Sequence, residues 1–219
     1  MTNSLNADDA DLVDTDFIDT DTVHIDRVLS TTRSVRRKLD FERPVEQQVI
    51  EDCISIATQA PVGMGGENWR FLVVRDERKK SQVAGVYQEV MHELTAARGI
   101  SIKATHQALM DRMHEMPALI FVCVIGQPES SYSSNVAFFG SILPAAWSLM
   151  LALRARGIGT TWTSLLSARE AEIAGILDIP EGVMQTVMLP IAYTKDARLK
   201  PADRLAAGEV TFVDTWGSR

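Results

Sequence analysis

The sequence predicts an α+β fold, an α/β three-layer architecture, in a single domain. Segments with helical periodicity alternate with about four short apolar segments of strand character. No internal repeat or interdomain linker separates them. The chain has 219 residues, of which 46% are hydrophobic, and this is enough for one substantial core. A compact one-domain enzyme fits these limits.

The first half of the chain is expected to form three helices and one strand. Residues 44–60 place apolar side chains at helical spacing, and Pro44 suits a first-turn position. Residues 71–75 form a short apolar strand. Residues 77–98 carry one apolar and one charged face, which indicates an amphipathic helix, and residues 101–115 form a further helix.

The second half supplies the remaining strands. Residues 118–125 are a continuous apolar run, which predicts a strand covered on both faces. Residues 158–163 and 183–193 are two more strands, with a helix over 169–177 between them. Pro190 cannot donate a backbone hydrogen bond, so it predicts an edge or a bulge in the last strand.

Residues 136–153 carry no charge over eighteen positions, which reaches the lower length limit of a membrane span. Ser141, Pro144 and Ser148 interrupt this segment, arginines follow it at once, and no second such segment exists, so we expect no membrane. A helix that is apolar all round must be covered by protein. Either the chain's own core or a second copy covers it, and the shortness of the chain favours an obligate homodimer.

The net charge of −7 belongs to one end of the chain. Residues 1–22 contain no lysine or arginine and seven aspartates: Asp8, Asp9, Asp11, Asp14, Asp16, Asp19 and Asp21. Removing these seven from the 29 acidic residues leaves 22, which equals the number of basic residues. We therefore predict a disordered acidic tail over 1–22 and a near-neutral folded domain over 23–219 with no nucleic-acid footprint. The tail lacks the basic start and apolar core of a secretory signal, which favours a cytoplasmic location.

Several kinds of catalytic centre are not indicated. Cys53 and Cys123 lie far apart without Cys-x-x-Cys spacing, so we expect buried reduced thiols. The four histidines show no metal-ligand spacing, and we predict no metal site. We find no Ser/His/Asp triad, no Walker loop and no dinucleotide-binding Gly-x-Gly-x-x-Gly after a strand.

A basic run with a hydroxyl, Arg33-Ser34-Val35-Arg36-Arg37, lies just ahead of the first strongly periodic helix. Guanidiniums around a hydroxyl suit a phosphate monoester. A solvated basic loop is the alternative, because short basic motifs are permissive. Three further segments follow it: a Gly-rich loop over 60–71, a small-residue strand over 157–163, and a basic segment over 200–205.

In this order and spacing, the four segments resemble the FMN-dependent nitroreductase family over roughly residues 25–216. The resemblance implies a nitroreductase-like fold, with a central, mostly antiparallel sheet flanked by helices, in an intertwined homodimer that binds FMN at the subunit interface. It also implies an oxidoreductase with NAD(P)H as cosubstrate and a nitroaromatic, quinone or similar flat small molecule as acceptor. The flavin N5 would carry the chemistry, so no catalytic side chain is expected.

The resemblance assigns the flavin phosphate to the basic run. Arg33, Ser34 and Arg36 match the family's basic, hydroxyl and second basic positions, while Thr32 replaces a leading arginine and can still donate a hydrogen bond. Arg204 matches a late arginine that closes over the same phosphate. These residues would enclose a terminal phosphate and leave no room for an adenylate, which predicts FMN and not FAD.

The small-residue strand is assigned to the flavin ring. Trp162, Thr163 and Ser164 would line the isoalloxazine, with the backbone N–H of Thr163 or Ser164 facing N5. The glycines of residues 157–159 would let the backbone approach a flat ring. Alternatively, Gly157 caps the preceding helix and Trp162 is ordinary core.

The loop after residue 60 departs most from the family. Val62, Gly65 and Glu67 stand where family members commonly have Ser/Thr, Asn and Gln, so side-chain hydrogen bonds to the ring edge are lost. Pro61 and Gly63 keep the pattern, and close backbone approach is preserved. By the resemblance, Pro61, Val62, Gly63 and Gly65 contact the flavin that is bound mainly by the other subunit, whereas Glu67 can equally be a solvated loop charge.

Three functions therefore compete. The first is the FMN-dependent oxidoreductase, working in ping-pong order. The second, motivated by the altered loop, is a flavin-binding or sensing protein with little turnover. The third is a dimerisation module without flavin. NAD(P)H oxidation by the purified protein separates the first two, and absence of flavin after denaturation would indicate the third.

Overall fold

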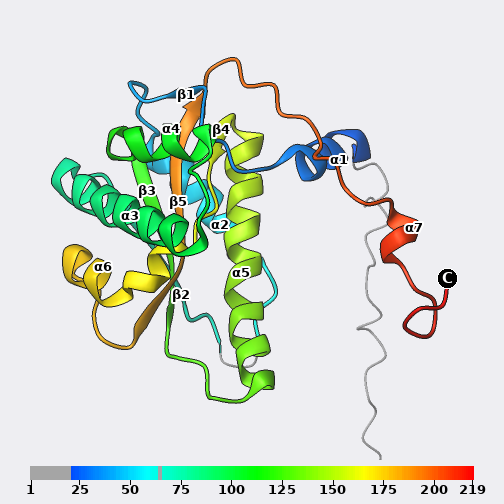
Figure 1. Ribbon diagram of the computed structural model, residues 1–219. Helices are drawn as coiled ribbons and strands as arrows, with labels where there is room; N and C mark the ends of the chain where they lie inside the picture. Colours follow the sequence, from blue (N-terminus) through cyan, green and yellow to red (C-terminus); the bar gives the residue numbers. More distant parts are fainter. Residues whose placement is uncertain (1–20, 64–65) are drawn as a thin grey trace, which may run out of the picture.

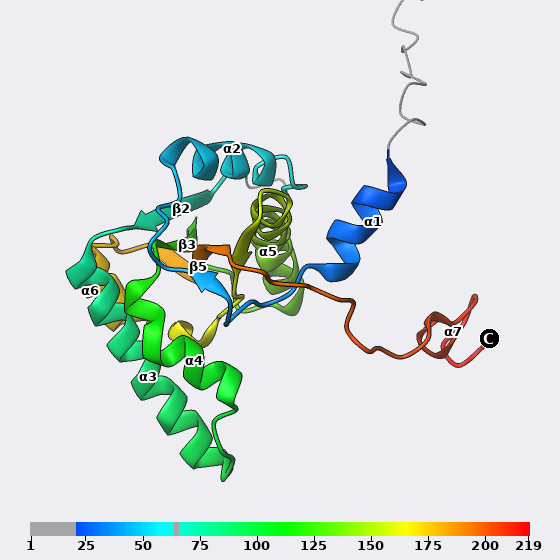
Figure 2. The same cartoon turned by 90° about the horizontal axis from the view of Figure 1, so that it is seen from above.

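The computed structural model describes residues 21–63 and 66–219, which form a three-layer body with a five-stranded antiparallel sheet in the middle (Figure 1). Helices α3, α4 and α6 cover one face of the sheet, and α2 and α5 cover the other, as the view from above shows (Figure 2). The elements in chain order are α1 (Thr22–Thr31), β1 (Leu39–Asp40), α2 (Gln47–Ala57), β2 (Trp69–Val74), α3 (Glu77–Arg98), α4 (Ala104–Arg112), η2 (Met113–Glu115), β3 (Ala118–Ile125), α5 (Tyr132–Ala155), β4 (Ile158–Thr160), η3 (Leu165–Arg169), α6 (Glu170–Leu177), β5 (Val183–Thr194) and α7 (Ala207–Val210).

The strand order is β1-β5-β3-β2, and β4 also pairs with β5. Every pairing is antiparallel. The predicted layered fold with a mostly antiparallel sheet is therefore confirmed. β5 lies at the centre, because β3 and β1 pair with successive parts of one of its edges while β4 pairs with the other edge.

β3 explains why the sheet is buried on both sides. Leu119, Phe121 and Cys123 enter the core under α3 and α6, whereas Ile120 and Val122 enter the core under α2 and α5. Successive side chains of a strand point to opposite faces, so a strand between two helical layers needs an unbroken apolar run. The prediction for 118–125 is confirmed to the residue.

Helix ends follow from local capping. α3 has the predicted bounds: the Asp76 side chain accepts a hydrogen bond from the Lys79 N–H at 2.8 Å, and Gly99 ends the helix with φ of 59°. α2 begins at Gln47, three residues after Pro44, because Glu46 has extended backbone. The helix predicted over 101–115 is longer than the observed α-helix. α4 covers Ala104–Arg112, and Met113–Glu115 form the separate 3-10 turn η2.

Pro190 lies inside β5, opposite Leu119 of β3, so the strand as a whole is not an edge. The ladder between β4 and β5 nevertheless stops at Thr160↔Ile191 and resumes only at the isolated bridge Thr163↔Met188. The missing proline N–H faces this interruption. A separate bulge shifts the β3/β5 register after Val122.

α5 is longer than predicted and continues through Pro144. By length and composition it is the single helix within the described residues that could cross a membrane, and 39% of its most apolar window is buried. Its second half lies in the core, with Ile142 and Leu149 fully buried, whereas Tyr132 and Val136 in its first half are exposed. One chain therefore covers only part of this apolar helix.

Four elements were not anticipated from the sequence: α1, β1, η3 and α7. In both views, α1 and the C-terminal arm (residues 196–219) project from the same side of the body (Figures 1 and 2). The arm exposes Leu205, Val210, Val213 and Trp216, the last at 93%. Residues 1–20 lie outside the described residues, so disorder of the tail stays a prediction, while Asp21 already serves as the N-cap of α1.

Candidate functional site

Two of the motifs found in the sequence lie side by side. The segment after α1 runs along the end of β4, where the Val35 N–H donates to the Thr160 carbonyl at 2.7 Å and the Thr161 hydroxyl donates to the Val35 carbonyl at 2.9 Å. The Trp162 N–H donates to the Ser34 hydroxyl at 3.1 Å. The basic run and the small-residue strand therefore form one continuous surface, although 128 residues separate Ser34 from Trp162.

Gly159 makes this approach possible. A Cβ at this position would stand 2.9 Å from the side chains of Leu39 and Thr194 and 3.2 Å from Val35. The glycine therefore serves the close packing of Val35, Leu39 and Thr194, and its expected approach to a flat ring stays a prediction. Gly157 has φ of 78° directly after α5, and its N–H bonds to the Arg154 carbonyl, so the alternative of a helix cap is confirmed.

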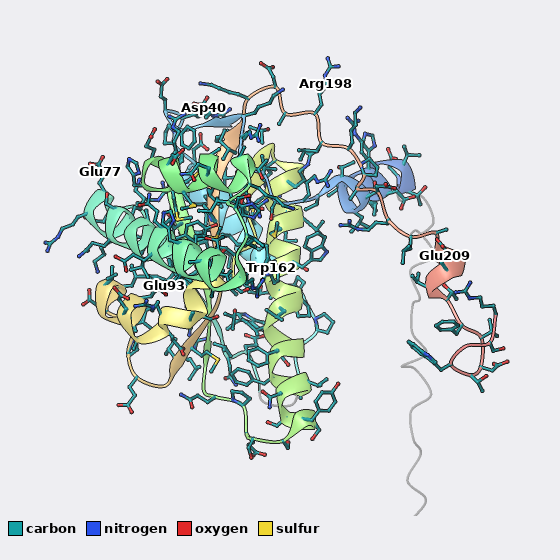
Figure 3. All side chains as sticks on the ribbon, in the orientation of Figure 1. Asp40, Glu77, Glu93, Trp162, Arg198 and Glu209 are labelled. Atoms are coloured by element: carbon teal, nitrogen blue, oxygen red, sulfur yellow. The ribbon has the colours of Figure 1, made fainter. Side chains whose placement is uncertain are left out.

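The basic run opens onto a groove of about 940 Å³. One wall is the segment 33–38, and the other is formed by Thr105 at the start of α4 and by residues 196–199 after β5. The groove is strongly cationic: its lining includes Arg33, Arg36, Arg37, Lys38 and Arg198 and one acidic residue, Asp196. Asp40 and Arg198 are labelled at this edge of the molecule in Figure 3.

Arg36 is the most informative residue of the groove. Its Nε is buried and has no hydrogen-bond partner among the described residues. Burial lowers the pKa of the Arg36 guanidinium, which reflects the cost of removing the charge from water. Burial, together with the positive charges of Arg36 and Lys103, also lowers the pKa of His106 on α4. A phosphate would supply the acceptor and the negative charge that this place lacks, so the residues present fit a phosphate monoester.

The other predicted phosphate ligands are less favourably placed. Arg33 lines the groove, and its Nη1 donates to the Lys200 carbonyl at 2.9 Å, which ties the basic run to the arm. Thr32 caps α1, and its hydroxyl donates to the Val28 carbonyl at 2.6 Å, so this proton is already used. Arg204 lies on the arm outside the residues that line the groove, and its Nη1 donates to the carbonyl of its neighbour Asp203.

The sequence predicts that the backbone N–H of Thr163 or of Ser164 faces the flavin, and one of these two N–H groups is free to do so. The Thr163 N–H donates to the Met188 carbonyl at 3.2 Å, so it is used within the sheet. Ser164 is exposed at the start of η3, and its N–H has no acceptor among the described residues. Of the two amides considered, only that of Ser164 can face a ligand. Trp162 is half-buried against the core under α2 and α5.

Two buried side chains that the sequence did not single out support this loop. Tyr87 on α3 lies under it: burial raises the pKa of its phenol, while nearby Arg36 and Thr163 lower it. Gln185 on β5 is 6% exposed, and neither polar atom of its amide has a partner within the described part of the chain. A void of about 10 Å³ between Gln185 and the loop has room for about one water.

The loop after α2 lines a different, more apolar cavity of about 210 Å³ beside the first half of α5. Val62 and Gly63 contribute to it, and Pro61 is exposed next to them. The Gly63 N–H donates to the Ser141 hydroxyl at 3.0 Å, and a Cβ on Gly63 would come within 3.1 Å of that oxygen, so a side chain there would require Ser141 to shift. Gly65 lies outside the described residues, and Glu67 is exposed.

The two cavities share no lining residue among the described positions. The basic groove is lined by residues next to β1 and by the start of the arm, whereas the loop cavity is lined by the first half of α5; these segments can be followed in Figure 1. Within one chain, therefore, the predicted phosphate ligands and the predicted ring-edge loop do not line a common cavity. Within the described residues, no cluster of three or more His, Cys, Asp or Glu could hold a metal ion.

The chain has relatives among known proteins. Residues 29–193 match the family described as the nitroreductase family. The chain is 27% identical over 179 residues to an iodotyrosine deiodinase of Thermotoga neapolitana, covering 78% of this chain and 90% of that protein. It is 24% identical over 176 residues to a putative NADH dehydrogenase/NAD(P)H nitroreductase of Archaeoglobus fulgidus, covering 78% and 86%.

Solved structures show the same fold. A crystal structure of oxidized iodotyrosine deiodinase bound to FMN and 3-iodo-L-tyrosine superposes with a TM-score of 0.60 at 21% identity, covering 83% of this chain and 96% of that chain. The matched family region ends before the arm, so Arg204 lies beyond it.

Proposed function

Because the chain belongs to the nitroreductase family, we propose that this oxidoreductase binds FMN and passes electrons from NAD(P)H to a nitroaromatic, a quinone or a similar flat acceptor. The observation that carries the proposal is the contact between the basic run and the flavin loop, with the unpaired Arg36 Nε beside it. Bound FMN would supply reversible two-electron chemistry. The protein would supply binding, orientation and fixed dipoles.

Each part of the surface has a role in this proposal. Arg33 and Arg36 hold the phosphate, and the charge-assisted bonds of each contribute about 1.5–3 kcal/mol. Ser34 fixes the distance between the phosphate segment and the loop through its bond with Trp162. The Ser164 N–H is the dipole left free to face the ring. No side-chain acid or base is required.

A spectrum of the purified protein tests the proposal. Flavin absorbance should be present, and anaerobic addition of NADH or NADPH should bleach it, with colour restored by a quinone. Heat release followed by chromatography should identify FMN. A colourless protein that takes up no FMN would refute the proposal. Flavin that no nicotinamide nucleotide reduces would instead favour a flavin-binding or sensing protein with little turnover.

Relatives named iodotyrosine deiodinase favour a second candidate reaction of the same site. In reductive deiodination, two electrons and one proton replace the carbon–iodine bond by a carbon–hydrogen bond, and iodide leaves. The test is iodide release from 3-iodo-L-tyrosine by dithionite-reduced protein. Iodide formation at a rate above that with a nitroaromatic acceptor would make this the preferred reaction.

We also propose that the working unit is a homodimer in which each site uses both chains. One chain leaves the first half of α5 and the arm uncovered, and its loop cavity lies apart from its basic groove. A second copy would cover the apolar surface and could bring its loop to the first copy's groove. The cytoplasm is the expected location of such a protein.

Mixed dimers test the shared site. One chain carries Arg36→Ala, and the other carries Gly63→Trp, whose side chain would fill the space where Ser141 approaches. Each homodimer should be inactive, while the heterodimer should place both lesions in one site and leave the other intact, which restores about half of the wild-type activity. Equal loss in the isolated heterodimer, or a monomer in sedimentation, would contradict sharing. Thermal melts of both homodimers control for unfolding.

A further inference from the structure

We propose that the outer part of the basic groove binds a second phosphate group, carried by a nucleotide, beside the phosphate held by Arg33 and Arg36. The inference rests on the proposed function and deepens it, because the favoured source is the 2′-phosphate of NADPH. A second source is the adenylate phosphate of a dinucleotide flavin. The relevant side chains are Arg37, Lys38 and Arg198, which we call the outer cations.

The size of the groove is the first argument. At about 940 Å³ the groove lies near the upper end of the ~300–1,000 Å³ range of ligand pockets, which is far more than one phosphate requires. The half-buried Arg36 marks the inner end, whereas the outer cations are exposed. The flavin phosphate would therefore occupy only the inner end of the groove.

The balance of charge is the second argument. Five cations and one carboxylate line the groove. A phosphate monoester carries a charge of about −1.5 to −2, so a net positive charge of about two remains after it binds. Neither Arg37 nor Arg198 has an ion-pair partner anywhere in the described ranges 21–63 and 66–219. Like charges gathered without a counter-charge attract an anion from solution.

The rigidity of the outer wall is the third argument. Lys38 and Asp196 both have left-handed backbone, with φ of 57° and 50°, which is costly for residues other than glycine. The Lys195 N–H donates to the Lys38 carbonyl at 2.7 Å, and the Lys38 Nζ donates to the Asp196 carbonyl at 3.2 Å. Leu39 of β1 also pairs with Thr194 of β5, and this pairing holds the two turns at Lys38 and Asp196 together. The outer cations therefore stand on two turns held together before any ligand arrives.

NADPH differs from NADH only by the 2′-phosphate, so the outer cations would give the enzyme a preference for NADPH. Arginine suits this role, because its fork binds phosphate oxygens through two hydrogen bonds. An exposed cation is screened by salt, so its contribution is smaller than that of Arg36. We expect each outer arginine to account for about a fivefold to tenfold preference.

Calorimetric titration with adenosine 2′,5′-bisphosphate tests binding without turnover. The protein is used as purified, with its bound flavin, and adenosine is the reference ligand. The bisphosphate should bind more tightly than adenosine, and Arg37→Gln and Arg198→Gln should each weaken it about fivefold to tenfold. Arg78→Gln, an exposed arginine on α3 away from the groove, is the matched control and should change nothing.

Steady-state kinetics and flavin analysis separate the two sources. A ratio of kcat/KM for NADPH over NADH that is high in wild type and falls in both groove variants assigns the second phosphate to NADPH. FAD in the purified protein, lost more readily from the groove variants than from Arg78→Gln, assigns it to the flavin. Bound FMN with no tighter binding of the bisphosphate than of adenosine, or equal behaviour of groove and control variants, overturns the inference.

A failure of the proposed function has a different signature. A protein without flavin, or with flavin that no nucleotide reduces, would refute the oxidoreductase. The titration with adenosine 2′,5′-bisphosphate would still decide whether the groove takes a second phosphate.

Discussion

Replacement of Arg36 by methionine should stabilise the flavin-free protein and reduce the further stabilisation that bound FMN gives. In the empty protein, the Arg36 Nε is buried without a partner, and an unsatisfied buried group costs about 1–3 kcal/mol. Methionine keeps most of the apolar stem and removes the guanidinium. The melting temperature of the flavin-free variant should rise, because 1 kcal/mol corresponds to about 2–4 °C for a chain of this size.

The same change removes a charge-assisted bond to the phosphate. We expect the FMN dissociation constant to rise about tenfold to a hundredfold. A ligand at one hundred times its dissociation constant stabilises by about 2.7 kcal/mol, and most of this is lost when the affinity falls thirtyfold. At one fixed FMN concentration, FMN should therefore raise the melting temperature of the variant much less than that of wild type.

Fluorescence titration of FMN and melts with and without FMN measure both effects. Arg36→Lys keeps the charge and loses the fork, so its FMN affinity should lie between those of wild type and methionine. Arg78→Met serves as the control for losing an exposed arginine. Unchanged FMN affinity in Arg36→Met, or a lower melting temperature of its flavin-free form, would refute the assignment of this side chain to the phosphate.

Three further predictions follow from the placement of other residues. Arg204→Ala should weaken FMN about tenfold or more if the arm closes over the phosphate, and equal affinity in flavin titration would leave the phosphate to the residues of the groove. Deletion of residues 1–20 should leave flavin content and melting temperature unchanged, because a segment so rich in aspartate cannot bury a core; loss of folding would contradict this. Burial raises the pKa of Cys123 to about 12, and Cys53 is also buried, so neither thiol should react with a thiol reagent at pH 8 before unfolding; fast native labelling would show that the core opens.

The sequence was most informative where local pattern decides structure. Residues 77–98 and 118–125 were predicted to the residue, because amphipathic periodicity and an unbroken apolar run report directly on the face that is buried. The two short elements β1 and α7 carry too few residues for a period to emerge. α1 was missed as well, and its exposed Val23 and Leu29 show that no core of this chain sets its pattern.

The segments that form the candidate site could be predicted from the sequence, but the contacts between them could not. The basic run and the small-residue strand were both found. The hydrogen bond from the Trp162 N–H to the Ser34 hydroxyl joins residues 128 positions apart, and the periodicity of hydrophobic residues carries no information on such contacts. For the same reason, the packing around Gly159 and the pairing of Thr163 with Met188 could not be predicted from the sequence. Arg198 carried no local signal, because its turn reaches the groove only through the pairing of β1 with β5.

The unsatisfied groups of the chain have a common location. The buried polar atoms without partners in the described residues belong to Arg36, Arg154 and Gln185. Arg36 lies beside β4, Arg154 lies in the last turn of α5 just before β4, and Gln185 lies under the loop that follows β4. Most of the large apolar side chains that are left exposed lie on α1, the first half of α5 and the arm. Native proteins rarely leave buried donors unpaired or large apolar patches exposed. An anion and a ring beside β4, with a second copy over α5 and the arm, would satisfy most of these groups at once, which is why one proposal accounts for both cofactor and dimer.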